Sequence, residues 1–335
     1  MRSSPRHRLW LSVFFALLIA ASVTAPVAAQ NSIPREWERQ FPLTDWSRSS
    51  VDIGAIQSGG PPRDGIPSID DPRFAPVATV EGLADNAPVM SLEVEGVARA
   101  YPISILIWHE IVNDVIAGQP VAVTYCPLCN SGVVFDRTVD GQVLEFGTTG
   151  KLRNSDLIMY DRQTETWWQQ FTGVGIIGDL VNVDLGRIPV RHEAFGRFAA
   201  RNPDGEVLVP TDPRLRSYGR NPYIGYDTST RPFLYRGDYT GPGSALMRVV
   251  SVEDEAWSMA LIRREGEILA GDLILRWEAG KASALDAPLV DQGREIGNVE
   301  VVRRTATGEE LVVFDIPFAF AFNAFHPDGV IHHTR

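Results

Sequence analysis

Cysteine is almost absent from this sequence: its 335 residues include only Cys126 and Cys129. This scarcity excludes a disulfide-rich scaffold. It also excludes a four-cysteine zinc or iron site within one chain, because such a site needs a second pair. No C-x-x-C-H pattern occurs, so covalent attachment of haem c is excluded as well. The two thiols stand three positions apart, which leaves a tight disulfide or part of a metal site.

Basic residues are also fewer than acidic ones, 31 against 42. The formal net charge is −11, and no long basic run interrupts the sequence. Nucleic-acid binding needs a basic surface, so we expect no nucleic-acid partner. The P-loop, H-E-x-x-H and G-x-S-x-G patterns are missing, and we expect no nucleotide cofactor.

Long apolar runs are confined to the N-terminus. Residues 1–29 combine early arginines, an apolar run at 9–23 and small residues ending at Ala29. This order is typical of a secretory signal peptide, and the run is shorter than the ~20 residues of a spanning helix. We therefore expect an exported protein, periplasmic or extracellular, with no stable membrane span after cleavage.

Export would place the cysteines in an oxidising compartment. A disulfide across so small a loop stabilises a fold by only about 2 kcal/mol in the chain-entropy model. Redox cycling or metal ligation explains the spacing better than simple cross-linking does.

The remaining sequence predicts a β-rich α+β fold of antiparallel hairpins or a meander with a few short helices. Residues 30–75 are rich in Pro, Gly, Ser and Asp and predict an extended N-terminal arm. Residues 76–330 predict a single β-rich domain, in which Glu95-Gly96 and Asp140-Gly141 are two-residue hairpin turns. The segments that favour helix are 102–108, 192–201 and 253–264.

A weak internal repeat suggests two related β-units. Residues 94–98 (VEGVA) resemble residues 252–256 (VEDEA), and each string precedes an apolar stretch and a glycine-containing turn. We therefore consider a duplication of 88–175 and 245–322. The second copy lacks the cysteine pair, which makes the pair an addition to the scaffold.

The surroundings of the cysteines separate two kinds of chemistry. A strand at 121–125 runs into Cys126, as in thioredoxin-type sites. The residues after Cys129 predict a turn and another strand, so the helix that would acidify the first thiol is missing. The second interpretation is a metal site, and with one cysteine pair histidine must complete it.

His109 is the first histidine candidate, because it precedes the strand that should pair with the one ending at Cys126. Glu110 or Asp114 could orient its ring. A histidine buried in the core and bonded to backbone is the alternative. His326, after the apolar stretch 314–325, is the second candidate. Two thiolates with one or two imidazoles suit copper before zinc.

Aromatic and amide side chains offer a different site. Trp167 and Trp168, with Asn154, could line a groove for a small-molecule ligand, although a packed sheet face explains the tryptophans as well. The function hypotheses are therefore a transition-metal site, a thiol–disulfide redox protein and a non-catalytic ligand-binding module. None of them decides whether the protein is an enzyme.

Several motifs occur in a recognisable order, namely 69–74 (IDDPRF), 98–102 (ARAYP), 108–114 (WHEIVND), 124–129 (TYCPLC), 135–137 (FDR) and 157–162 (LIMYDR). Together they resemble an uncharacterised prokaryotic family, catalogued as domain of unknown function three-one-seven-nine, over roughly residues 60–330. The resemblance supports the cysteine site and implies no reaction.

Overall fold

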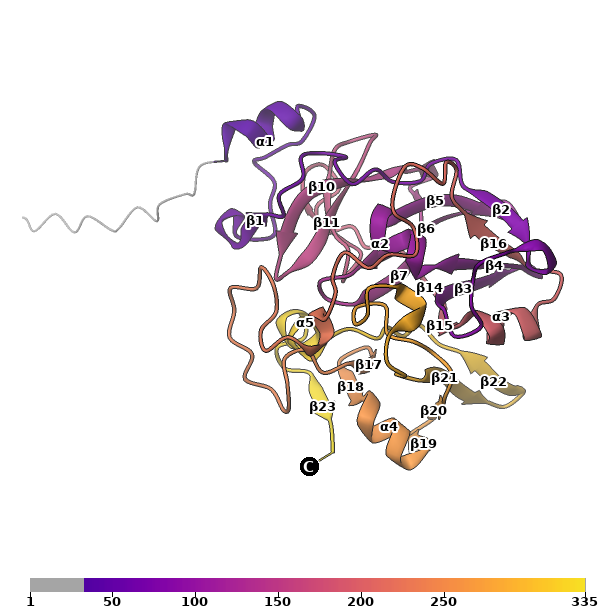
Figure 1. The fold of residues 1–335 in the computed structure, drawn as a ribbon. Coiled ribbons are helices and arrows are strands. Elements are labelled where there is room, and N and C mark those ends of the chain that lie inside the picture. The colour runs from indigo at the N-terminus through magenta and orange to yellow at the C-terminus, as the bar shows by residue number, and fades with distance from the viewer. Residues whose placement is uncertain (1–32, 335) are drawn as a thin grey trace, which may run out of the picture. The chain divides into compact units, whose positions relative to one another are not determined.

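The computed structural model describes residues 33–334 of the chain (Figure 1). The predicted signal peptide, 1–29, lies outside the described residues. Strands make up 39% and helices 15%, and the five larger sheets are arranged like the blades of a propeller. The predicted β-rich fold with small antiparallel sheets and short helices is confirmed.

Three sheets are built mainly from residues before 210. One contains, in spatial order, β1 (Ile56–Ser58), β10 (Phe146–Arg153), β11 (Asp156–Asp161), β12 (Trp167–Gln169) and β13 (Val174–Ile177). The next contains β14 (Arg187–Ile188), β7 (Ser131–Asp136), β6 (Gln119–Cys126) and β5 (Ile111–Ile116). The third contains β15 (Arg191–Ala194), β3 (Pro88–Val94), β4 (Val97–Pro102), β16 (Glu206–Val209) and β2 (Arg73–Pro76).

The other two large sheets come from the C-terminal part of the chain. One contains β17 (Val249–Val252), β18 (Glu255–Ser258) and β23 (Val330–His332). The other contains β19 (Glu267–Ala270), β20 (Leu273–Glu278), β21 (Asn298–Thr305) and β22 (Gly308–Leu311). A small ribbon of β8 (Thr138–Val139) and β9 (Gln142–Val143) closes on the predicted Asp140-Gly141 turn.

The helices of the described chain are short. The α-helices are α1 (Arg35–Gln40), α2 (Ile103–His109), α3 (Phe195–Arg201), α4 (Met259–Glu265) and α5 (Ala319–Phe325). Single 3₁₀ turns are η1 (Ile53–Ala55), η2 (Val77–Thr79), η3 (Tyr226–Thr228) and η4 (Val290–Gln292). Among the described residues, no helix combines the length and the apolar character needed to cross a membrane.

The largest hydrophobic core surrounds β5, β6 and α2 and includes both cysteines. Val121, Val123 and Ile111 are fully buried there, so the central strands bury side chains on both faces. Continuous burial of this kind explains why their sequences read as apolar runs and not as an alternating pattern. The cysteine pair is therefore part of the core and not of a surface turn.

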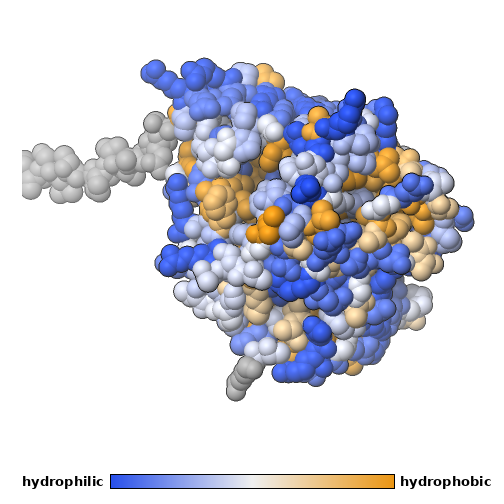
Figure 2. All heavy atoms as spheres, in the orientation of Figure 1, coloured by the Kyte–Doolittle hydropathy of each residue, from blue (hydrophilic) through white to orange (hydrophobic). Residues whose placement is uncertain are grey.

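The segment 33–75 holds α1, η1, β1 and β2 and otherwise consists of turns. It is fastened to the first sheet, because β1 pairs with β10 and Trp37 packs 5.3 Å from Trp167. Phe41 meets the same indole ring edge-on at 5.0 Å. In the view of Figure 2 the surface is mainly hydrophilic, with scattered apolar patches.

Candidate metal centre in the cysteine loop

The cysteine loop connects two neighbouring strands. β6 ends at Cys126, β7 begins at Ser131, and the two residues pair across the ladder. The turn is completed by Asn130, whose φ of 53° is a conformation that asparagine tolerates better than most residues. The strand after the cysteines is the one that the sequence predicts, so the thioredoxin-type helix is not present here. Both thiols are free and buried.

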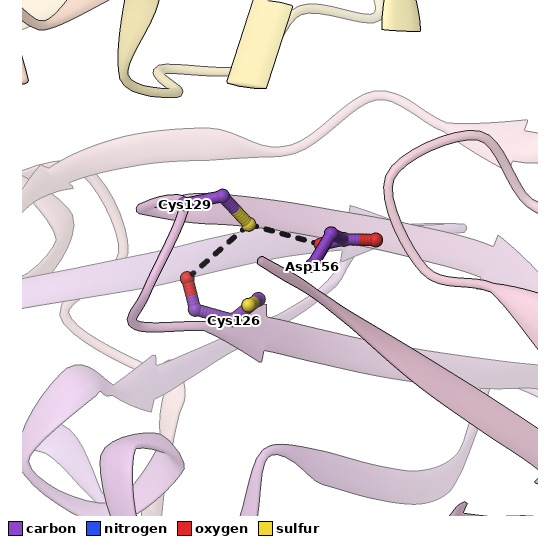
Figure 3. Close-up of side chains that lie close together, drawn as sticks. All are labelled: Cys126, Cys129 and Asp156. Atoms are coloured by element: carbon purple, nitrogen blue, oxygen red, sulfur yellow. Dashed lines mark hydrogen bonds between the residues drawn. The ribbon is translucent and has the colours of Figure 1, made fainter. Parts of the chain in front are cut away.

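Asp156 reaches the loop from the adjacent β10–β11 hairpin. Arg153 pairs with Asp156, and between them Asn154 and Ser155 both have positive φ, 55° and 64°. Such a two-residue turn matches the twist of a hairpin. It brings Asp156 to the cysteines, so that the Sγ of Cys129 lies 2.9 Å from its Oδ1 (Figure 3).

The three ligand atoms form a compact group. The sulfurs of Cys126 and Cys129 and a carboxylate oxygen of Asp156 all lie within 4.8 Å of one another. The second carboxylate oxygen accepts hydrogen bonds from Gln169 Nε2 at 2.6 Å and from the backbone N–H of Phe171 at 2.8 Å. These two hydrogen bonds hold the carboxylate in place and leave its first oxygen, Oδ1, facing the sulfur of Cys129. The arrangement can offer two sulfurs and one oxygen to a single ion.

Burial sets the protonation state of this cluster. Desolvation raises the pKa of Asp156 to about 6, although its hydrogen bonds oppose the shift. It also raises the pKa of the Cys126 thiol, and raises that of the Cys129 thiol well above its ordinary value. Among the described residues no ion pair joins Asp156 to a basic side chain. The cluster therefore holds three acidic groups without a direct cationic partner.

Glu110 adds a fourth acidic group to this region. Burial first, and the negative charge of Asp156 second, raise the pKa of its carboxyl to about 8. Its backbone carbonyl accepts the N–H of Tyr125 at 2.8 Å, which places it beside the strand that ends at Cys126. Glu110 also ends α2 with φ 60°, an unfavourable conformation for any residue except glycine. Strained, buried acidic residues of this kind cluster at functional sites.

His109 is turned away from the sulfurs. Its Nδ1 lies 2.7 Å from the carbonyl oxygen of Pro67, and its Nε2 lies 2.7 Å from the hydroxyl of Tyr218. Both ring nitrogens therefore have hydrogen-bond partners, as in the alternative of a core histidine. The cause is the left-handed residue after the helix, which redirects the chain between His109 and β5.

His326 lies in a different environment. Its ring stacks on Phe322 at 5.0 Å and lies 6.1 Å from Phe171. It lines the edge of a cleft of about 460 Å³ with Arg187 and Asp315. The structure does not bring its nitrogens into the cluster of Cys126, Cys129 and Asp156.

The other predicted site residues have structural partners. Asp114 accepts from Arg99 Nη1 at 2.9 Å and from the Tyr101 hydroxyl at 2.5 Å, so its carboxylate belongs to an ion pair and does not orient His109. Trp167 and Trp168 are fully buried and line no open groove. Asn154 belongs to the turn that carries Asp156.

A long segment without strands, 210–248, covers the cysteine loop. The hydroxyl of Tyr226 donates to the carbonyl of Leu128 at 2.8 Å, and the Oγ of Ser155 donates to the carbonyl of Phe233 at 2.5 Å. The cysteine loop, through Leu128, and the turn before Asp156, through Ser155, are thus both hydrogen-bonded to this segment.

Comparison with known families assigns the chain. Residues 63–329 match the family described as "Protein of unknown function (DUF3179)". The chain belongs to this family. No curated protein and no solved structure matches it. The cysteine loop, Glu110 and Asp156 all lie inside the matched region, so the site belongs to the family domain and not to a terminal extension.

Proposed function

We propose that this exported protein binds a transition-metal ion through Cys126, Cys129 and Asp156, with zinc before copper. The observation that carries the proposal is the buried convergence of two thiols and one carboxylate within 4.8 Å. Export is supported by the signal-peptide pattern of residues 1–29.

The electrostatics favour a cation at this place. Buried charges are stable only when they are paired or bound to a metal, and this cluster has no basic partner in an ion pair. A divalent ion would take up both thiolates and the carboxylate, and the thiol protons would leave on binding. The raised thiol pKa values make metal binding weaker at low pH and stronger as the pH rises.

The ligand atoms found in the structure reverse the order of preferred metals that the sequence suggests, which is copper before zinc. Copper is favoured by soft sulfur ligands together with imidazole, whereas zinc also accepts carboxylate oxygen. The third donor here is Asp156, and both nitrogens of His109 are engaged elsewhere. Zinc therefore fits the described donors better than copper.

The test is metal analysis of the natively exported protein, combined with zinc and copper titration of the chelator-treated form. We expect stoichiometric zinc in the wild type. The Cys126→Ser, Cys129→Ser double variant should lose it, and Asp156→Asn should bind about 10-fold more weakly or worse, because a ligand matters at least as much as an outer-shell partner.

Asp161→Asn is the matched control. Asp161 is equally buried at the opposite end of β11, and its carboxylate accepts from the indole of Trp168. This variant should keep its metal. Metal-free exported protein with an intact Cys126–Cys129 disulfide would overturn the proposal, and copper in place of zinc would overturn the order of metals.

A thiol–disulfide redox protein is the second candidate. It is favoured by the contact between the Cys129 thiol and Asp156, because a carboxylate at 2.9 Å can take the thiol proton during exchange. This function requires a potential of about −120 to −270 mV, the range of known exchange catalysts. A pair that resists reduction far below that range rules this candidate out. A non-catalytic ligand module, the third hypothesis, would bind its ligand normally after both cysteines are replaced.

A further inference from the structure

A small cavity lies beside the cysteine loop, and its mainly apolar wall carries a few polar side chains. Its volume is about 50 Å³, and Tyr125 and Asn130, the residues that flank the two cysteines, form part of its wall. Lys281 and Arg248 contribute the charged part of the lining. A cavity needs roughly 10–15 Å³ to hold one water molecule, so this one has room for a small polyatomic ligand.

Lys281 is a buried cation without a carboxylate bonded to its amine. Its side chain is 4% exposed, and its Nζ donates to the backbone carbonyl of His192 at 2.7 Å. An ammonium has three donors. The carboxylates that attract it are occupied, since Glu193 pairs with Arg201 at 2.9 Å and Glu295 accepts the backbone N–H of Lys281 itself.

Arg248 brings a second buried cation to the same cavity. Its Nη2 donates to Asp227 and to Ser283, each at 2.8 Å, and its Nε has no hydrogen-bond partner. Asp227 is shared, because Arg294 also donates to it at 2.8 Å. Arg294 has a further partner in Asp286 at 3.6 Å, whereas Asp227 is the one carboxylate in an ion pair with Arg248 among the described residues.

The two cations affect each other. Burial lowers the pKa of Lys281 to about 7, and the positive charge of Arg248 contributes to the same shift. His192, also on the cavity wall, is uncharged at neutral pH, because burial lowers its pKa to about 3. Its imidazole lies 3.9 Å from Asp315, whose carboxylate accepts the backbone N–H groups of Gly132 and Ile316. The lining of the cavity, as the described residues form it, thus includes two basic side chains and no carboxylate.

We propose that this cavity binds a small oxyanion of the carboxylate or phosphate class, held by the Lys281 ammonium, the Arg248 guanidinium and the Tyr125 hydroxyl, whose single hydrogen turns from Asn130 Oδ1 to the ligand. An oxyanion fits because guanidinium, ammonium and hydroxyl groups donate to carboxylate and phosphate oxygens. Donors on the wall remain available, because Arg248 Nε has no hydrogen-bond partner and the Lys281 ammonium, with three hydrogens, makes one hydrogen bond. The site does not depend on a metal at the cysteines.

The test uses the mature chain with sodium acetate, sodium phosphate and sodium chloride at constant ionic strength. Calorimetric titration and thermal unfolding measure binding. We expect acetate or phosphate to bind and to raise the unfolding temperature, and chloride to have little effect. Lys281→Met should weaken oxyanion binding by about 10- to 100-fold, which corresponds to a lost charge-assisted hydrogen bond.

Lys151→Met is the matched control. Lys151 is also buried, at 3% exposure, but it lies on β10, and its Nζ has only a weak contact of 3.4 Å to the Thr149 carbonyl. This variant should keep oxyanion binding. A second variant, Tyr125→Phe, should weaken binding roughly 3- to 10-fold and serves if Lys281→Met does not fold.

Two results would overturn the proposal. One is equal stabilisation by all three salts, which indicates general screening. The other is oxyanion binding that survives both Lys281→Met and Tyr125→Phe. Metal content is measured on the same samples, so that failure of the oxyanion site and failure of the zinc site can be distinguished. Loss of zinc with retained oxyanion binding would contradict only the zinc proposal.

Discussion

Two parts of the molecule repeat the same order of helices and strands, but the residues at matching positions differ in burial and in chemical character. In the first, the β3–β4 hairpin leads into the seven-residue helix α2 and then the β5–β6 hairpin. In the second, the β17–β18 hairpin leads into the seven-residue helix α4 and the β19–β20 hairpin (Figure 1). The duplication of 88–175 and 245–322 stays a prediction, but these two units can be compared position by position.

The residue that ends each helix differs most clearly. In the second unit it is Gly266, with φ 76°, and it is exposed. In the first unit it is Glu110, with φ 60°, and it is buried. Glycine is the residue that this conformation favours. The glutamate is therefore unfavourable for both backbone and burial, which is the pattern of a functional residue more than of a structural one.

The residues of the two proposed sites lie at the end of the last strand of each unit or shortly after it. Cys126 ends β6 in the first unit, and Lys281 comes shortly after β20 in the second. The cavity proposed to bind an oxyanion touches both units through Tyr125 and Lys281. If both proposals hold, the hairpin–helix–hairpin unit serves as a scaffold, and the loop after it carries the binding residues.

The largest expected effect concerns the fourth residue after each helix, Asn113 after α2 and Leu269 after α4. Asn113 is buried and bonds the N–H of Phe146 at 2.9 Å and its C=O at 2.8 Å, whereas Leu269 is 61% exposed. Asn113→Leu should lower the free energy of unfolding by about 3–5 kcal/mol, because it leaves both backbone groups buried and unpaired. Leu269→Asn should change it by about 0.5 kcal/mol at most. Urea unfolding measures both, and similar losses would contradict the contrast.

The next effect concerns pH. The carboxyl of Glu110 stays protonated in the folded protein up to about pH 8, whereas it ionises at its ordinary value, 4.5, in the unfolded chain. The folded state therefore loses stability as the pH rises from 4.5 to 8. One such group lowers the free energy of unfolding by about 1.4 kcal/mol for each pH unit in this range. Asp156 contributes in the same direction between 3.8 and about 6. In the chelator-treated protein, Glu110→Gln should flatten the fall between pH 6 and 8, by about 2–3 kcal/mol in total.

Glu193→Gln is the control for this pH effect. Glu193 is also buried, but Arg201 and Ser91 bond its carboxylate, so its pKa is lowered. Its stabilisation is present above its ordinary value and is lost only as the pH falls. Glu193→Gln should therefore destabilise the protein at pH 6 and at pH 8 alike and leave the slope unchanged. A wild-type stability that is flat between pH 6 and 8 would contradict the raised pKa of Glu110.

Local signals in the sequence predicted most of the hairpins. The turns at Glu95-Gly96 and Asp140-Gly141 form where expected, because two-residue turns depend on residues that tolerate positive φ. Strand partners beyond the turn were harder to predict. β7 pairs with β6 and does not continue across the Asp140-Gly141 turn to β10, since the central sheet offers a longer buried partner, and only the short strands β8 and β9 pair across that turn.

The site was predicted only in part, for the same reason. The C-x-x-C spacing located the thiols, and the run into a second strand was confirmed. Asp156, the third donor of the proposed metal site, was missed because it is 27 residues from Cys129 and meets it only through packing of two sheets. The Asn154-Ser155 turn before it was the available signal. His109 was favoured by its sequence position, which does not reveal how a left-handed Glu110 redirects the chain.

The smallest effect isolates the backbone. No atom lies within 4 Å of a Cβ built on Gly266, so Gly266→Ala changes the conformational energy and almost nothing else. We expect a loss of about 1–2 kcal/mol in unfolding free energy, the cost of a left-handed alanine. Gly186→Ala is the control, because its φ is not in that region and its nearest neighbour is 3.8 Å away. This control should be neutral or slightly stabilising. If the two variants lose equal stability, positive φ is not the feature that separates the helix ends, and the strain assigned to Glu110 loses its support.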